Sequence, residues 1–121
     1  MTAKVLYVDD EADIREVATM ALELDPALEV RSCGSGEEAL RIAPEWRPDL
    51  ILLDVMMPVM DGPTTLARLR SLDSVGNTKV VFITARAQSS DVDRLRELGA
   101  QGIIPKPFYP MSLAEEVRKY L

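Results

Sequence analysis

The feature that most constrains this sequence is an uninterrupted apolar run at residues 50–53, which ends on a single acidic residue, Asp54. The run has no alternation of apolar and polar residues, which is typical of a strand buried on both faces of a parallel sheet. An ionised carboxylate is costly to bury in such a sheet. We therefore expect Asp54 at the rim, where the strand leaves the core.

Two other strand-like runs also lead into polar side chains. One near the N-terminus runs into Asp9 and Asp10, and one in the second half of the chain runs into Thr84. If these strands are parallel, their carboxyl ends lie at one edge of the sheet. The sequence therefore predicts that Asp9, Asp10, Asp54 and Thr84 converge there.

Length and composition indicate a single domain over residues 1–121, because 121 residues with 47% hydrophobic content can bury a core. The single cysteine, Cys33, excludes an intramolecular disulfide and fits a reducing compartment. No apolar run approaches the ~18 residues of a membrane span, and the N-terminus passes straight into a strand without a signal peptide. We expect a cytoplasmic protein with no membrane partner.

Charge and histidine content exclude other classes of function. The net charge is −6, which argues against direct nucleic-acid binding by this domain. The sequence contains no histidine, so no Ser–His or Cys–His nucleophile can be built from it.

The whole chain alternates strand and helix signals, with no internal repeat or linker. Strands are expected at residues 5–8, 28–33, 50–54, 79–83 and 102–104, and helices at about 10–25, 35–43, 63–72, 89–99 and 110–121. This alternation predicts an α/β fold, a doubly wound five-stranded parallel sheet of (βα)5 type. The second strand alternates in polarity and belongs at an edge, so we expect the order 2-1-3-4-5, with the switch point between strands one and three.

Local signals set the expected ends of the helices. We expect Asp10 or a neighbour to cap the first helix, and Ser35, with a glutamate three residues later, to cap the second. The second helix should end at Ala43, because Pro44 follows it. The segment that begins at Ser89 should cap the fourth helix.

The polar residues at the strand ends suit a divalent cation and a phosphoryl group. Clustered carboxylates repel one another unless a cation shares them, and these hard oxygen ligands favour Mg²⁺ over zinc. Lys106 follows the fifth strand and could reach the same rim, and Thr84 offers a hydroxyl. Each residue alone has a simpler reading, such as a helix cap or a solvated lysine. Together they predict a Mg²⁺-dependent phosphoryl site with an aspartate as the nucleophile.

Four motifs follow one another along the chain: residues 8–11 (VDDE), 54–58 (DVMMP) with 60–62 (MDG), 84–85 (TA) and 106–108 (KPF). In this order and at these spacings they resemble the motifs of the response-regulator receiver domains of two-component signalling, whose fold is flavodoxin-like. The resemblance covers essentially the whole chain. It implies a phosphoacceptor signalling domain rather than an enzyme, with intrinsic self-phosphorylation and autodephosphorylation chemistry.

The resemblance also implies a role for each matching residue. Asp54 would accept the phosphoryl group, Asp10 would bind Mg²⁺ directly, and Asp9 would help to hold the metal through water. The backbone carbonyl of Met56 would be a further metal ligand.

The remaining matches concern binding of the phosphoryl group and the response to it. Lys106 would bond a phosphoryl oxygen, with a cis bond to Pro107, and Thr84 would do so after phosphorylation. The family usually has an aromatic switch residue on the fifth strand, three residues before the lysine. Here that position is Ile103. We expect phosphorylation to shift the face built from the fourth helix, fifth strand and fifth helix, with weaker or different coupling.

The partners implied are a histidine kinase or histidine phosphotransferase and a downstream protein target. The domain would be a monomer or a weak, phosphorylation-dependent dimer. The sequence ends at Leu121 without an output domain, so the resemblance allows either a stand-alone receiver or one excised from a longer protein. A phosphorylation-independent interaction module of the same fold is the alternative.

Two other classes fit the residues less well. An aspartyl phosphatase of the haloacid dehalogenase type needs a second aspartate two residues after the nucleophile, and Met56 stands there. A flavodoxin-like FMN binder needs a phosphate loop rich in Gly, Ser and Thr after strand one. Asp9 and Asp10 would repel phosphate at that position.

Overall fold

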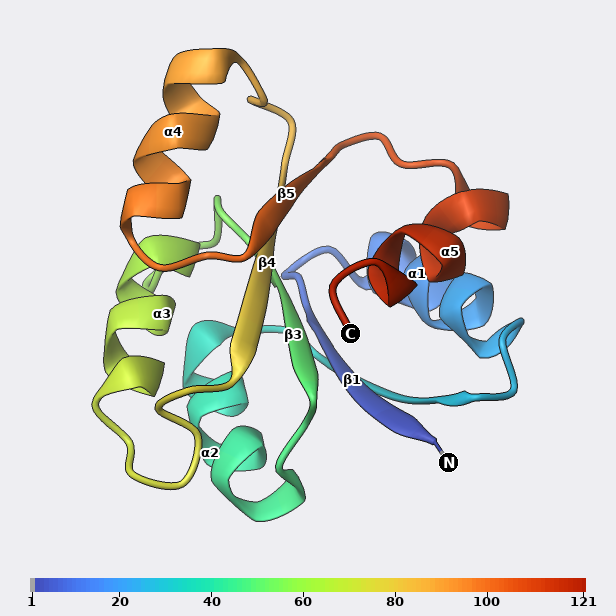
Figure 1. The fold of residues 1–121 in the computed structure, drawn as a ribbon, viewed down its shortest axis with the longest axis horizontal. Coiled ribbons are helices and arrows are strands. Elements are labelled where there is room, and N and C mark those ends of the chain that lie inside the picture. The colour runs from blue at the N-terminus through green and yellow to red at the C-terminus, as the bar shows by residue number, and fades with distance from the viewer. Residues whose placement is uncertain (1) are drawn as a thin grey trace.

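The computed structural model describes residues 2–121 and contains one parallel sheet of five strands in the order β2-β1-β3-β4-β5 (Figure 1). The strands are β1 (Ala3–Val8), β2 (Leu28–Cys33), β3 (Leu50–Asp54), β4 (Lys79–Thr84) and β5 (Gly102–Pro105). The fold class and strand order predicted from the sequence are confirmed. The all-apolar third strand lies at the centre, and all of its residues are buried.

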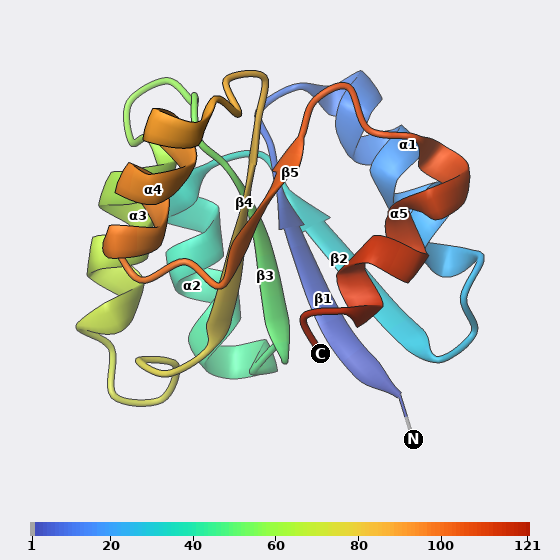
Figure 2. The ribbon, with the colours of Figure 1, turned by 45° about the horizontal axis from the view of Figure 1, so that its top comes forward.

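Helices cover both faces of the sheet. They are α1 (Ala12–Glu23), α2 (Gly36–Trp46), α3 (Gly62–Arg70), α4 (Ser89–Glu97) and α5 (Pro110–Arg118). Figures 1 and 2 show α1 and α5 together on one side, with α2, α3 and α4 on the other. This placement is the doubly wound arrangement that right-handed crossovers produce.

The sheet separates two apolar cores, and the strands contribute alternate residues to each. On β1, Leu6 and Val8 belong to the core under α2, α3 and α4. Val5 and Tyr7 belong to the core under α1 and α5. This alternation determines which side chains of β1 lie on the same face of the sheet as Asp9.

The second helix does not end at Ala43, as the proline signal predicted. It continues through Pro44 to Trp46. Proline removes one helical N–H from the interior of the helix. The last turn persists because Trp46 packs against the core and the N–H of Arg47 donates to the carbonyl of Ala43 at 2.8 Å.

The expected side-chain caps are only partly present. Ser35 accepts a hydrogen bond from the N–H of Glu38 at 3.1 Å, as predicted. The first and fourth helices instead follow Glu11 and Gln88, and neither side chain makes a capping bond. The N-cap of α1 is thus a neighbour of Asp10, as predicted, although without a side-chain bond. The prediction that the segment at Ser89 caps the fourth helix was wrong, because Gln88 precedes it as the N-cap.

None of the helices within residues 2–121 has the length and apolar character needed to span a lipid bilayer.

Candidate functional site

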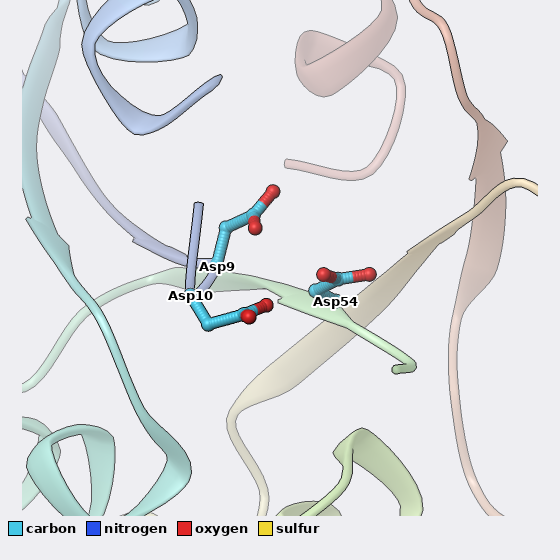
Figure 3. Close-up of side chains that lie close together, drawn as sticks. All are labelled: Asp9, Asp10 and Asp54. Atoms are coloured by element: carbon cyan, nitrogen blue, oxygen red, sulfur yellow. The ribbon is translucent and has the colours of Figure 1, made fainter. Parts of the chain in front are cut away.

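The acidic residues predicted to converge do so at the carboxyl ends of β1 and β3. These strands pair in parallel, with Val8 opposite Leu53, so the next residues, Asp9 and Asp54, leave the sheet side by side. Asp9, Asp10 and Asp54 each offer a carboxylate oxygen, and these atoms lie within 4.8 Å of one another. Figure 3 shows the three side chains gathered where the two strands end.

Lys106 joins this cluster from the loop after β5. Its Nζ lies 2.9 Å from Oδ2 of Asp9 and 3.2 Å from Oδ2 of Asp54. Burial alone would lower the pKa of Lys106, but its bond to Asp9 and the charges of both carboxylates outweigh burial and hold that pKa above its usual value. Lys106 is therefore a fixed positive charge between two buried carboxylates. Its peptide bond to Pro107 is cis, as expected.

Asp54 lies in a place that disfavours its ionised form. Only 5% of the residue is exposed. Burial and the nearby charge of Asp9 raise the pKa of Asp54 above its usual value, although Lys106 acts in the opposite direction. The three carboxylates thus carry more negative charge than the single ammonium neutralises.

Asp9 is fully buried, and its oxygens have several donors. Oδ1 accepts the N–H of Glu11 at 3.0 Å, and Oδ2 accepts the hydroxyl of Tyr7 at 3.0 Å. The guanidinium of Arg15 donates to the carbonyl oxygen of Asp9 at 2.8 Å, which fixes the start of α1 against the strand end. Asp10, in contrast, is exposed to solvent.

The fourth strand brings Thr84 to the same edge. Ile83 pairs with Asp54, so Thr84 is the next residue outward. Its hydroxyl is buried and accepts the N–H of Arg86 at 3.0 Å. Ile103 pairs with Phe82 one strand further on, where it packs against the core under α2, α3 and α4.

The donor set fits a magnesium ion. Aspartate carboxylates are hard oxygen ligands, and two of the three are buried where uncompensated negative charge is costly. The exposed Asp10 leaves one side open to solvent, and Mg²⁺ in proteins usually retains several waters. Met56 follows on the β3–α3 loop and is 72% exposed.

Reasoning from the sequence missed the hydroxyl of Tyr7 as a partner of this cluster. A usable signal was present, since side chains two positions apart on a strand lie on the same face. Tyr7 precedes Asp9 by two residues, which indicates the same face, and its hydroxyl donates to the Asp9 carboxylate.

The fold and the acidic edge together define a doubly wound α/β domain with a candidate cation site at its topological switch point. A family model described as "Response regulator receiver domain" matches residues 5–118. The chain therefore belongs to the response-regulator receiver domain family.

Curated relatives include longer proteins. A protein-glutamate methylesterase/protein-glutamine glutaminase of Halalkalibacterium halodurans is 44% identical over 120 residues, which is 98% of this chain and 34% of the relative. The DNA-binding response regulator MtrA of Mycolicibacterium paratuberculosis is 37% identical over 121 residues, all of this chain and 52% of the relative. The chain thus spans between about a third and about half of the length of these relatives.

Solved structures include one of similar length. The chemotaxis response regulator CheY4 of Vibrio cholerae has a TM-score of 0.91 and 33% sequence identity, with all of both chains covered. Its fold therefore corresponds to the present one from end to end.

Proposed function

We propose that this chain is a phosphoacceptor domain, in which Asp54 takes a phosphoryl group from a phosphohistidine of a histidine kinase or histidine phosphotransferase. The observation that carries the proposal is the position of Asp54. It ends the central strand within ligand distance of two more carboxylates and in contact with Lys106. We assign the whole of residues 1–121 to this one domain.

The metal in the proposal is Mg²⁺, held by Asp10 and Asp54, by Asp9 through water, and by the backbone carbonyl of Met56. When bound, it would neutralise negative charge on the transferring group. The carboxylate oxygens of the three aspartates lie close enough together to share one ion.

In the transfer step, a carboxylate oxygen of Asp54 attacks the phosphorus in line with the bond to the donor histidine. An O–P bond forms and the P–N bond breaks, and the electron pair of that bond returns to the imidazole nitrogen, which takes up a proton. Lys106 moves its ammonium from Asp54 to a phosphoryl oxygen, and the hydroxyl of Thr84 donates to another. Positioning and charge neutralisation supply most of the catalysis in such reactions. Hydrolysis of the aspartyl phosphate at the same site ends the signal.

The donor protein would contact an apolar surface of this chain beside the site. A pocket of about 350 Å³ lies between α1 and the β5–α5 loop, where Ile14, Val17 and Phe108 line it next to Lys106. A partner that places its histidine over Asp54 would cover this pocket. The domain would then meet a downstream protein in the cytoplasm, as a monomer or as a weak dimer that forms on phosphorylation.

The output in the proposal is a shift of the face formed by α4, β5 and α5. Thr84 would leave its bond with the N–H of Arg86 to reach the phosphoryl group, which pulls on the β4–α4 loop. Ile103 carries no hydroxyl or ring, so its coupling to this movement would be by packing alone.

Beryllium fluoride, a mimic of the phosphoryl group, tests the proposal. We expect a protein-bound ¹⁹F resonance with Mg²⁺ in the wild type and none in Asp54→Ala. Amide chemical shifts should change in α4, β5 and α5 as well as around Asp54. Absence of the bound resonance in the wild type would contradict the phosphoacceptor proposal and favour a phosphorylation-independent interaction module. Changes confined to the loops around Asp54 would contradict the proposed output face.

A further inference from the structure

A polar group in the core beneath the acidic edge, the hydroxyl of Tyr7, points at that edge. Tyr7 lies near the carboxyl end of β1, an interior strand of the sheet, and is 0% exposed. Its hydroxyl donates to Oδ2 of Asp9 at 3.0 Å. A phenylalanine would fill the same apolar space, so the hydroxyl adds a bond to Asp9 rather than packing.

The hydroxyl of Tyr7 points toward Asp9 because of the spacing of the two residues along the chain. Tyr7 belongs to the core under α1 and α5, and the two-residue period of a strand puts Asp9 on the same face. A buried hydroxyl without a partner is costly, and Asp9 is the acceptor that Tyr7 has. The spacing of the two residues along β1 therefore brings the hydroxyl of the buried tyrosine to the Asp9 carboxylate.

The other donors to the Asp9 carboxylate come from loops. The N–H of Glu11 belongs to the β1–α1 loop, and the Nζ of Lys106 belongs to the β5–α5 loop. In the function proposed above, Lys106 turns toward a phosphoryl oxygen. The bond from Tyr7 is then the one that fixes Oδ2 from within the rigid sheet.

We propose that Tyr7 is a positioning residue of the acidic site, whose hydroxyl orients the Asp9 carboxylate for Mg²⁺. The inference rests on the function proposed above. It concerns how the site is held and assigns Tyr7 no contact with metal or phosphoryl group. Residues that orient metal-binding groups in this way typically change metal affinity by 10-fold to 100-fold when they are lost.

The test compares Tyr7→Phe with Val5→Ala in the full chain. Phe retains the ring and removes only the hydroxyl. Val5 lies on the same strand and in the same core, two residues further from the site. Its truncation removes buried apolar volume without touching Asp9. Mg²⁺ dissociation constants are measured by calorimetric titration with magnesium chloride, and the side-chain carboxyl ¹³C resonance of Asp9 is recorded without metal.

We expect Tyr7→Phe to raise the Mg²⁺ dissociation constant about tenfold and to shift the Asp9 carboxyl resonance. Val5→Ala should do neither. A rise below threefold, tighter binding, or an equal rise in Val5→Ala would overturn the role of Tyr7, whatever the carboxyl resonance does. If the wild type itself binds no Mg²⁺, the metal site of the proposed function fails, and this inference fails with it.

Discussion

At the scale of single residues, the site concentrates charge that the fold alone does not neutralise. Asp9 and Asp54 are buried beside one another, with Lys106 between them and Asp10 at the solvent side. Such a cluster costs free energy in the metal-free chain, and a cation bound as proposed would offset that cost.

The first prediction concerns Asp54→Asn. Burial raises the pKa of Asp54, so the folded chain binds this proton more tightly than the unfolded chain does. The cost to folding is absent below the unfolded pKa of about 4 and present at pH 7. Without Mg²⁺, Asp54→Asn should therefore increase the free energy of unfolding at pH 7 by about 1 kcal/mol.

Urea unfolding at several pH values measures this difference. The advantage of Asp54→Asn should vanish as the pH falls toward 4, and millimolar Mg²⁺ should reduce or reverse it at pH 7. A variant that is less stable than the wild type at pH 7 without metal would contradict the account of the charge cluster.

The second prediction concerns Val59 in the loop after Asp54. Val59 has a φ of 68° and is 95% exposed, so it adopts the left-handed conformation without any packing to offset it. A β-branched residue is disfavoured there by about 1 to 2 kcal/mol, whereas asparagine tolerates this region. Val59→Asn should raise the free energy of unfolding by about 1 kcal/mol. Val59→Ala, which retains a Cβ, is the matched control, and an equal or larger gain in that control would refute the strain explanation.

At the scale of elements, a single arginine side chain links the α3–β4 loop to the α4–β5 connection. The guanidinium of Arg70 at the end of α3 donates to the carbonyls of Gly76, Thr78 and Gly99. The first two lie in the α3–β4 loop and the third in the α4–β5 connection. Three carbonyls in two loops thus depend on one side chain.

We predict that Arg70→Met lowers the free energy of unfolding by about 2 kcal/mol, because these carbonyls lose a charged donor. Arg70→Lys should recover little, since one ammonium cannot match the planar fork of donors. Urea unfolding checks both variants. Full stability in Arg70→Lys would show that charge, and not the fork geometry, holds the two loops.

Most of the architecture could be predicted because it follows from hydrophobic periodicity. The apolar third strand, the alternating second strand and the regular spacing of helices were enough to place Asp54 beside Asp9. Helix ends were less predictable. Pro44 stayed inside α2 because the packing of Trp46 outweighed the lost hydrogen bond, and local residue preference does not reveal packing.

The site was predictable to the level of residue type and strand end, but not to the level of hydrogen bonds. The convergence of Asp9, Asp10 and Asp54 needed only the strand order. The bond from Tyr7 depends on a side-chain direction, and the bond between Thr84 and Arg86 depends on a loop conformation. Strand order carries neither kind of information, although the two-residue period gave a signal for Tyr7.

At the scale of the whole molecule, the sheet connects an acidic edge to two helical faces. Asp54 ends the central strand, next to the loop that leads into α3, and Thr84 ends the neighbouring strand, before the loop that leads into α4. In the proposed function, a change of charge at Asp54 would act on both loops. We therefore predict that one covalent event at Asp54 alters the molecule and that this event requires Mg²⁺.

The most direct measurement is the intact mass of the chain after incubation with acetyl phosphate, with and without Mg²⁺, for the wild type and Asp54→Ala. We predict a gain of one phosphoryl group in the wild type with Mg²⁺, and none without the metal or in the variant. No gain in the wild type, or the same gain in Asp54→Ala, would contradict the claim that Asp54 is the phosphoacceptor.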